Sequence, residues 1–169
     1  GYALEKIILH ATSMGLGTCW LGGFFNKKDF HNALNPAEEE VMPAVTPVGY
    51  TQKNRGTFGK VVRYVAGSRN RKPWSDLFFK PDFTPLPKED AGIFAEPLEM
   101  VRLGPSASNG QPWRIVIDGN SAHFYVKSKT GYETMVRLDM GIAVCHFDLS
   151  MKETDVNGEW SVQDPNLPS

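Results

Sequence analysis

The segment LGPSASNGQPWRI, residues 103–115, places prolines, small polar side chains, glycines and a tryptophan in one run between two apolar stretches. A connecting loop needs turn residues, which proline, glycine, serine and asparagine supply. It does not need Ser106, Asn109 and Gln111 gathered beside an aromatic side chain. The composition of this segment therefore indicates a loop with a purpose beyond connection.

The elements on either side of this segment can be predicted from their patterns. Before it, residues 88–103 have apolar residues at helical spacing, and Pro97 must either kink this helix or lie in its first turn. After it, residues 113–118 and 122–127 alternate around the turn-rich sequence DGNS, which predicts a β-hairpin. The segment is thus predicted to join a helix to the first strand of a hairpin.

The rest of the chain is predicted to mix helices and strands. Residues 2–15 have the apolar spacing of a helix, which glycine ends. Residues 51–88 are rich in Arg, Lys, Pro and Gly, and resemble an extended, partly ordered connection between two halves. The other predicted elements are a helix over 26–34 capped by Asn26, a buried strand over 42–50 and a helix over 138–153 capped by Asp139.

Composition limits the classes of partner. The 169 residues are 41% apolar, and 18 basic residues balance 19 acidic ones, so no charge excess points to nucleic acid or a membrane surface. No apolar run approaches the roughly 18–20 residues of a membrane span. The two cysteines have neither disulfide-framework nor zinc spacing. We expect a cytoplasmic protein that binds a small molecule.

The first residues suggest that something precedes them. Residues 1–17 begin inside an amphipathic pattern with no capping residue ahead of it, which predicts a missing N-terminal segment. Residues 1–20 and 141–160 can also be aligned with each other, because both are predicted amphipathic helices that end in glycine and then tryptophan. This similarity is a hint of an internal duplication.

Candidate sites each have a functional and an ordinary interpretation. Residues 15–23 contain glycines but not the spacing of a dinucleotide loop, and the four histidines lack ligand spacing. Cys19 is either a reactive loop thiol or a small semi-buried residue. Arg69 and Arg71 are either an anion site, particularly for phosphate, or part of a solvated basic linker. With no acid–base apparatus and no metal site predicted, an organic cofactor would have to carry the chemistry.

Four segments together resemble one family. They are MGLGTCWLGGF (14–24), SRNRKPWSDLFF (68–79), LGPSASNGQPWRIV (103–116) and LDMGIAVCHFDL (138–149). In this order they are similar to the FMN-dependent nitroreductase superfamily, above all to the branch in which one chain holds two half-folds and imitates a homodimer. The resemblance implies an α+β fold with a mixed or antiparallel sheet flanked by helices. It implies pseudo-duplicated half-folds, with the C-terminal part of the first at 1–80 and the second at 81–169, which together form one compact domain.

The resemblance also implies where FMN would bind, at the interface of the two halves. The PSASNxQPW match implies that Pro105, Ser106, Ala107 and Asn109 line the flavin, with Gln111 and Trp113 supporting the loop. The match to the family's loop beside the redox-active ring nitrogen implies contacts from Cys19, Trp20, Leu21 and Gly22. Arg69 and Arg71 correspond to a basic pair on the FMN phosphate. The Arg-x-Ser segment with which family members begin is absent before Gly1, so a missing segment or a second chain would complete the fold.

The expected function is an oxidoreductase without a dedicated catalytic acid or base. NAD(P)H would reduce FMN, and the flavin would reduce a flat small-molecule acceptor such as a nitroaromatic or quinone. Two alternatives remain open at this point. One is a non-catalytic module that binds or stores flavin, and the other is a degenerate homologue with a structural or interaction role.

Overall fold

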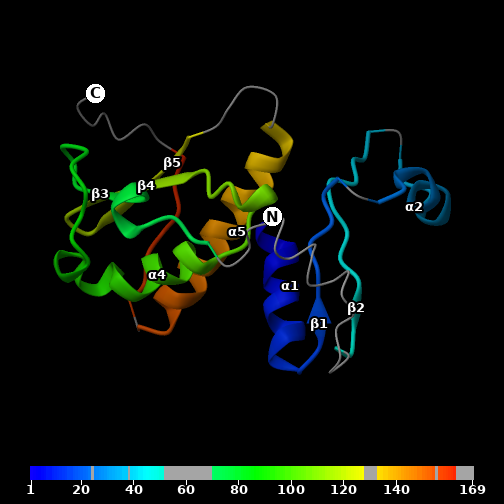
Figure 1. The fold of residues 1–169 in the computed structure, drawn as a ribbon, viewed down its shortest axis with the longest axis horizontal. Helices are drawn as coiled ribbons and strands as arrows, with labels where there is room; N and C mark the ends of the chain where they lie inside the picture. Colours follow the sequence, from blue (N-terminus) through cyan, green and yellow to red (C-terminus); the bar gives the residue numbers. More distant parts are fainter. Residues whose placement is uncertain (24, 38, 52–69, 128–132, 155, 163–169) are drawn as a thin grey trace.

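The computed structural model describes residues 1–23, 25–37, 39–51, 70–127, 133–154 and 156–162. Its helices are α1 (Tyr2–Ser13), α2 (Lys27–Leu34), α4 (Ala95–Leu103) and α5 (Glu133–Lys152). Its strands are β1 (Gly17–Thr18), β2 (Val48–Gly49), β3 (Phe78–Phe79), β4 (Trp113–Asp118) and β5 (Ser121–Val126). The fold is α+β, as predicted, with small sheets (Figure 1).

Two small sheets lie on opposite sides of the central helices. β1 pairs antiparallel with β2, and the second sheet has the order β3-β4-β5. Within this second sheet β3 runs parallel to β4 and β5 runs antiparallel to it, so the sheet is mixed. α5 packs against both α1 and α4, and thereby joins the two parts of the molecule (Figure 1).

The predicted hairpin is confirmed, because β4 and β5 pair along their whole length from Trp113–Val126 to Asp118–Ser121. The two residues between the strands include Gly119, whose φ of 55° is the conformation that such a short turn requires. Before β4, the predicted helix 88–103 is divided. Two short 3₁₀ turns precede α4, and Pro97 lies in the first turn of α4, which is one of the two positions expected for it.

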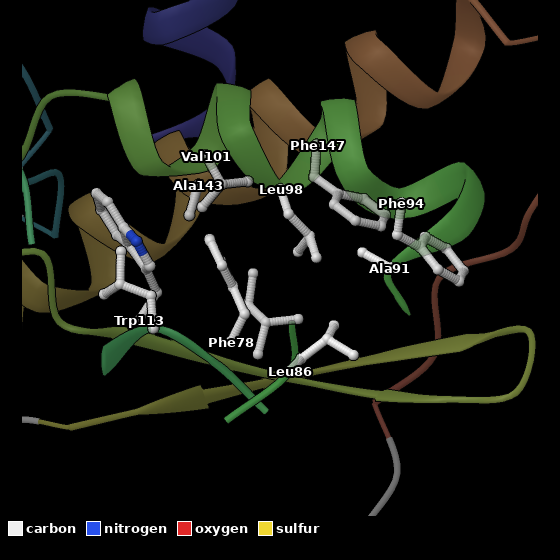
Figure 2. Packing of buried hydrophobic residues seen from close by; sticks show 11 residues of the cluster. Phe78, Leu86, Ala91, Phe94, Leu98, Val101, Trp113, Ala143 and Phe147 are labelled. Atoms are coloured by element: carbon white, nitrogen blue, oxygen red, sulfur yellow. The ribbon is translucent and has the colours of Figure 1, made fainter. Parts of the chain in front are cut away.

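The main core lies between this sheet and the helices α4 and α5 (Figure 2). Phe78 from β3 and Trp113 from β4 are 0% exposed, and they lie under Leu98 and Val101 of α4. Phe147 of α5 closes one side of the cluster, where its ring stacks on that of Phe94 with centroids 6.0 Å apart. This core supports the start of β4, to which the segment 103–115 leads.

Three predictions about the elements are corrected. Residues 42–50 are not a buried strand: only Val48–Gly49 pair in β2, both are exposed, and the two prolines earlier in the stretch lack the N–H that a longer ladder needs. Asp139 does not cap the last helix, because α5 begins at Glu133 and Asp139 lies within it, 4% exposed. Of the predicted connection 51–88, residues 52–69 lie outside the residues that the structure describes, and residues 70–88 are not merely a connection, since β3 lies within them.

The remaining predictions for helices are confirmed. α1 ends at Ser13, and Gly15 follows with a φ of 77°. Asn26 caps α2 by accepting a hydrogen bond from the Lys28 backbone N–H at 3.2 Å. Among the described residues, no helix combines the length and apolar character that crossing a bilayer requires.

Candidate functional site

The loop between α4 and β4 has an unusual backbone. Ser108, Asn109 and Gln111 all have positive φ, at 50°, 53° and 46°. Residues other than glycine seldom adopt this conformation, and it persists where the surroundings hold it. Two turn hydrogen bonds, from the Asn109 N–H to Ser106 O and from the Gly110 N–H to Ala107 O, contribute to holding it. The loop is therefore a defined structure whose side-chain contacts need explanation.

Gln111 anchors the loop from inside. Its side chain is 1% exposed, and its Oε1 accepts a hydrogen bond from the Lys72 backbone N–H at 2.8 Å. Its Nε2 donates to the Asn109 carbonyl oxygen at 3.1 Å, and its backbone N–H donates to Ser106 Oγ at 2.9 Å. The supporting role that the resemblance implies for Gln111 thus has a direct structural counterpart.

Arg71 contacts the same loop from the segment before β3. Its Nη1 donates to Asn109 Oδ1 at 2.7 Å, and its Nε and Nη2 donate to the Leu103 carbonyl oxygen at 3.2 and 2.9 Å. Asn109 Nδ2 in turn donates to the Asn70 carbonyl oxygen. The structure therefore brings together two residues predicted for the site, Arg71 and Asn109. Arg69 lies outside the residues that the structure describes.

Cationic side chains gather around this loop. Burial and the charge of Arg102 lower the pKa of Arg71 below its usual range, although Arg102 itself pairs with a glutamate on α4. Burial and the charge of Arg114 lower the pKa of Lys72, with Asp76 acting in the opposite direction. For both groups burial is the larger cause and the neighbouring cation the smaller one. The surroundings of the loop are therefore cationic.

Asp139 supports the loop from α5. Its Oδ1 accepts a hydrogen bond from the Ala107 backbone N–H at 2.9 Å. Burial raises the pKa of Asp139 to about 6, and this hydrogen bond offsets only part of the effect. The sequence pattern alone places Asp139 at a helix end. The sequence feature that marks Asp139 is an acidic residue within an apolar helical run. Only the folded structure shows that its carboxylate accepts from the Ala107 N–H.

Asp139 makes a testable contribution to stability. Its folded pKa of about 6 lies above its ordinary 3.8, so between these values the unfolded chain releases the proton first and stability falls as pH rises. The destabilisation caused by the buried charge of Asp139 is absent below pH 3.8 and fully present above pH 6. An asparagine side chain at this position would keep the acceptor for Ala107 without the charge. As pH rises from 4 to 7, we expect the free energy of unfolding of Asp139→Asn to increase by roughly 2–3 kcal/mol relative to that of the parent chain. Urea unfolding measures this difference. A stability difference that does not change with pH would contradict this.

The second predicted group, Cys19–Gly22, lies beside α1. Cys19 is exposed, and its backbone N–H donates to Thr46 Oγ1 at 3.2 Å. Leu21 forms an isolated bridge with Val45, in which each backbone N–H donates to the other's carbonyl oxygen at 2.9 Å. Gly22 faces the start of α5, where a Cβ on it would lie 2.8 Å from Met135 Sδ. This segment is therefore held on one side by residues 45–46 and on the other by α5.

Trp20 connects this segment to a buried carboxylate that sequence reasoning missed. Trp20 Nε1 donates to Glu5 Oε2 at 2.7 Å, and His146 Nε2 lies 2.8 Å from Glu5 Oε1. Glu5 is 2% exposed. The available signal was a charged residue on the face of α1 that also buries Ile8 and Ala11.

The comparison that decides the family covers most of the chain. A family described as "Putative TM nitroreductase" matches residues 1–151. The chain belongs to this family. A crystal structure of a "putative nitroreductase" from Thermotoga maritima is similar to it in fold, with a TM-score of 0.59 and 25% sequence identity. The match covers 90% of this chain but 54% of the other, so the chain spans about half the length of that protein. No curated protein matches the chain.

In this member of the nitroreductase family, α5 lies against both predicted groups. Met135, near its start, is the residue next to Gly22, and Asp139 accepts from Ala107. His146 lies beside Gly104, where a Cβ would be 3.4 Å from the ring carbon Cδ2. A cavity of about 460 Å³ also opens beside the start of α5, but its lining contains none of the predicted site residues. It is lined by Gly1, Val41, Pro43, Thr134, Arg137 and Leu138.

Proposed function

We propose that the chain forms part of an FMN-dependent oxidoreductase, in which NAD(P)H reduces the flavin and the flavin reduces a nitroaromatic or quinone-type acceptor. The observation that carries the proposal is the family match over residues 1–151, which includes the loop at 103–115 and the segment at 19–22. When bound, FMN supplies the ring that accepts and donates hydride. The chain itself is expected to bind the flavin and the substrates and to orient them.

The residues present fit a flavin phosphate in two respects. Ala107 and Ser108 are exposed at the tip of the loop, while the side chains of Gln111 and Asn109 behind it are engaged in hydrogen bonds. A surface held rigid before binding loses little conformational entropy when a ligand docks on it. The cations around Arg71 would offset the negative charge of the phosphate.

The proposed contacts of individual residues differ in what supports them. For Pro105 and Ala107, support comes from their place on the rigid loop, whereas Ser106 and Asn109 use side-chain atoms to brace it. Arg71 also braces the loop, so its share in phosphate binding would come from charge more than from direct contact. Contacts from Cys19–Gly22 and Arg69, and the half-folds 1–80 and 81–169, stay predictions of the resemblance.

The test is titration of the purified chain with FMN, followed anaerobically by NADH and NADPH. We expect a visible flavin band that shifts on binding and bleaches with nicotinamide. Asn109→Ala removes the acceptor of Arg71 Nη1 and should weaken FMN binding about tenfold. Asn120→Ala, the same substitution at an exposed turn residue between β4 and β5, is the matched control and should leave the affinity unchanged.

Each contrary outcome selects one of the alternatives. Flavin that binds but does not bleach with either nicotinamide would favour a binding or storage module. Absence of FMN binding, even once the predicted N-terminal segment is restored, would favour a structural homologue. Equal loss of affinity in the Asn109 and Asn120 variants would remove the loop from the proposed site.

A further inference from the structure

Glu5 holds two side chains from distant parts of the sequence. Its carboxylate has a different partner on each oxygen: the Trp20 indole N–H on Oε2 at 2.7 Å, and His146 Nε2 on Oε1 at 2.8 Å. The indole N–H is the donor to Oε2, whereas the direction of the hydrogen bond between His146 and Oε1 depends on the tautomer of the imidazole ring. These contacts join α1, the segment after β1 and α5 through a single group that is 2% exposed.

Burying the Glu5 carboxylate is unfavourable for the stability of the fold. Burying a carboxylate removes it from water, and a well-packed apolar side chain in such a place is often at least as stabilising as a buried ionic group. The neighbours of Glu5 on the buried face of α1, Ile8 and Ala11, are apolar. What the carboxylate adds to packing is direction, because two hydrogen bonds fix where the indole and imidazole rings lie.

The two rings belong to the two groups of the candidate site. Trp20 lies in Cys19–Gly22, and His146 lies beside Gly104, at the start of the loop that carries Ala107 and Asn109. The carboxylate of Glu5 therefore connects the first group to the helix that supports the second. Within the part of the chain that the structure describes, no other side-chain hydrogen bond joins Cys19–Gly22 to a helix.

We propose that Glu5 is a positioning residue for the flavin site: its two hydrogen bonds fix Cys19–Gly22 relative to α5 and so to the loop at 104–112. The part of this proposal that concerns FMN binding rests on the proposed function. It does not assign Glu5 any contact with the flavin. The part that concerns Trp20, namely that Glu5 fixes the position of its indole ring, does not depend on any cofactor.

The test compares three variants of the chain. Glu5→Ala removes both acceptors. Glu5→Gln keeps an amide oxygen that can accept from Trp20 while it removes the charge. Ile8→Ala, one turn further along the buried face of α1, loosens the packing without touching either hydrogen bond, and is the matched control for stability.

Two readouts are measured on each variant. One is the indole ¹H–¹⁵N resonance of Trp20 in the FMN-free chain, distinguished from those of the other three tryptophans by its loss in Trp20→Phe. The other is the dissociation constant for FMN. We expect Glu5→Ala to shift the Trp20 resonance and weaken FMN binding about tenfold, while Glu5→Gln stays within about threefold of the parent chain. Ile8→Ala should change neither readout, although it lowers the melting temperature.

The outcomes separate this proposal from the proposed function. If no FMN binds even once the predicted N-terminal segment is restored, the proposed function fails, and the Trp20 resonance alone decides whether Glu5 positions Trp20. An unchanged Trp20 resonance in Glu5→Ala overturns the proposal in either case. Loss of FMN affinity in Ile8→Ala equal to that in Glu5→Ala overturns it as well, since general loosening would then explain the effect. If Glu5→Ala does not fold, a shifted resonance and weakened binding in Glu5→Gln would overturn the positioning role.

Discussion

Phe78→Ala is expected to lower the free energy of unfolding by about 3–5 kcal/mol, because it removes a fully buried ring and leaves a cavity at the centre of the core. The Phe78 side chain is 0% exposed, and it contacts the Trp74 ring edge-to-face with centroids 4.5 Å apart. Figure 2 shows it between the sheet and the residues Leu98 and Val101 of α4. Urea unfolding of the variant measures the loss.

The control for this prediction is Phe83→Ala. Phe83 is 43% exposed, so the same substitution there removes less buried surface than it does at Phe78. We expect it to cost clearly less free energy of unfolding than Phe78→Ala. Similar losses in the two variants would mean that Phe78 does not lie at the centre of the core.

Gln111→Ala is expected to destabilise the chain by about 2–4 kcal/mol and to weaken FMN binding by far more than the Asn109 variant does, because the hydrogen bonds of the Gln111 side chain to Lys72 and Asn109 are lost at once. The substitution removes the acceptor of the Lys72 N–H and the donor to the Asn109 carbonyl oxygen. Each buried polar group left without its partner costs about 1–3 kcal/mol. The positive φ of Gln111 would then lose the side-chain contacts that hold it.

Gln111→Met separates hydrogen bonding from volume, because methionine fills a similar space without either bond. We expect it to be nearly as destabilising as alanine, and to weaken FMN binding equally. The measurements are urea unfolding and FMN titration of both variants. A methionine variant with the stability and affinity of the parent chain would show that packing alone shapes the loop.

The parts of the fold that are governed by local sequence could be predicted. The β4–β5 hairpin follows from alternation around a glycine turn, and the cap of α2 from an asparagine at its start. β3 could not be predicted in this way. Two residues give no periodicity, and the partner of Phe78–Phe79 is Ile115–Val116, far along the chain. Its existence depends on a pairing that only the folded chain defines.

The site shows the same division. Composition and family resemblance single out the segment 103–115, and its internal bonds explain why Asn109 and Gln111 stand in it. For Asp139 the sequence predicts the right chemistry with the wrong partner: its carboxylate does accept from a backbone N–H, but from Ala107 and not from its own helix. Glu5 could not be found, because a single charge on an apolar helical face does not say which side chains will meet it.

The parallel pairing of β3 with β4 has a consequence for the order in which the molecule assembles. β4 and β5 are joined by two residues, and hairpins of this kind close in about 1–10 μs. β3 reaches β4 only after the crossover that contains α4 has folded back, and closing so long a loop costs entropy before any contact compensates for it. The loop at 104–112 lies within that crossover. We therefore expect it to take its final shape late, after the hairpin that follows it in the sequence.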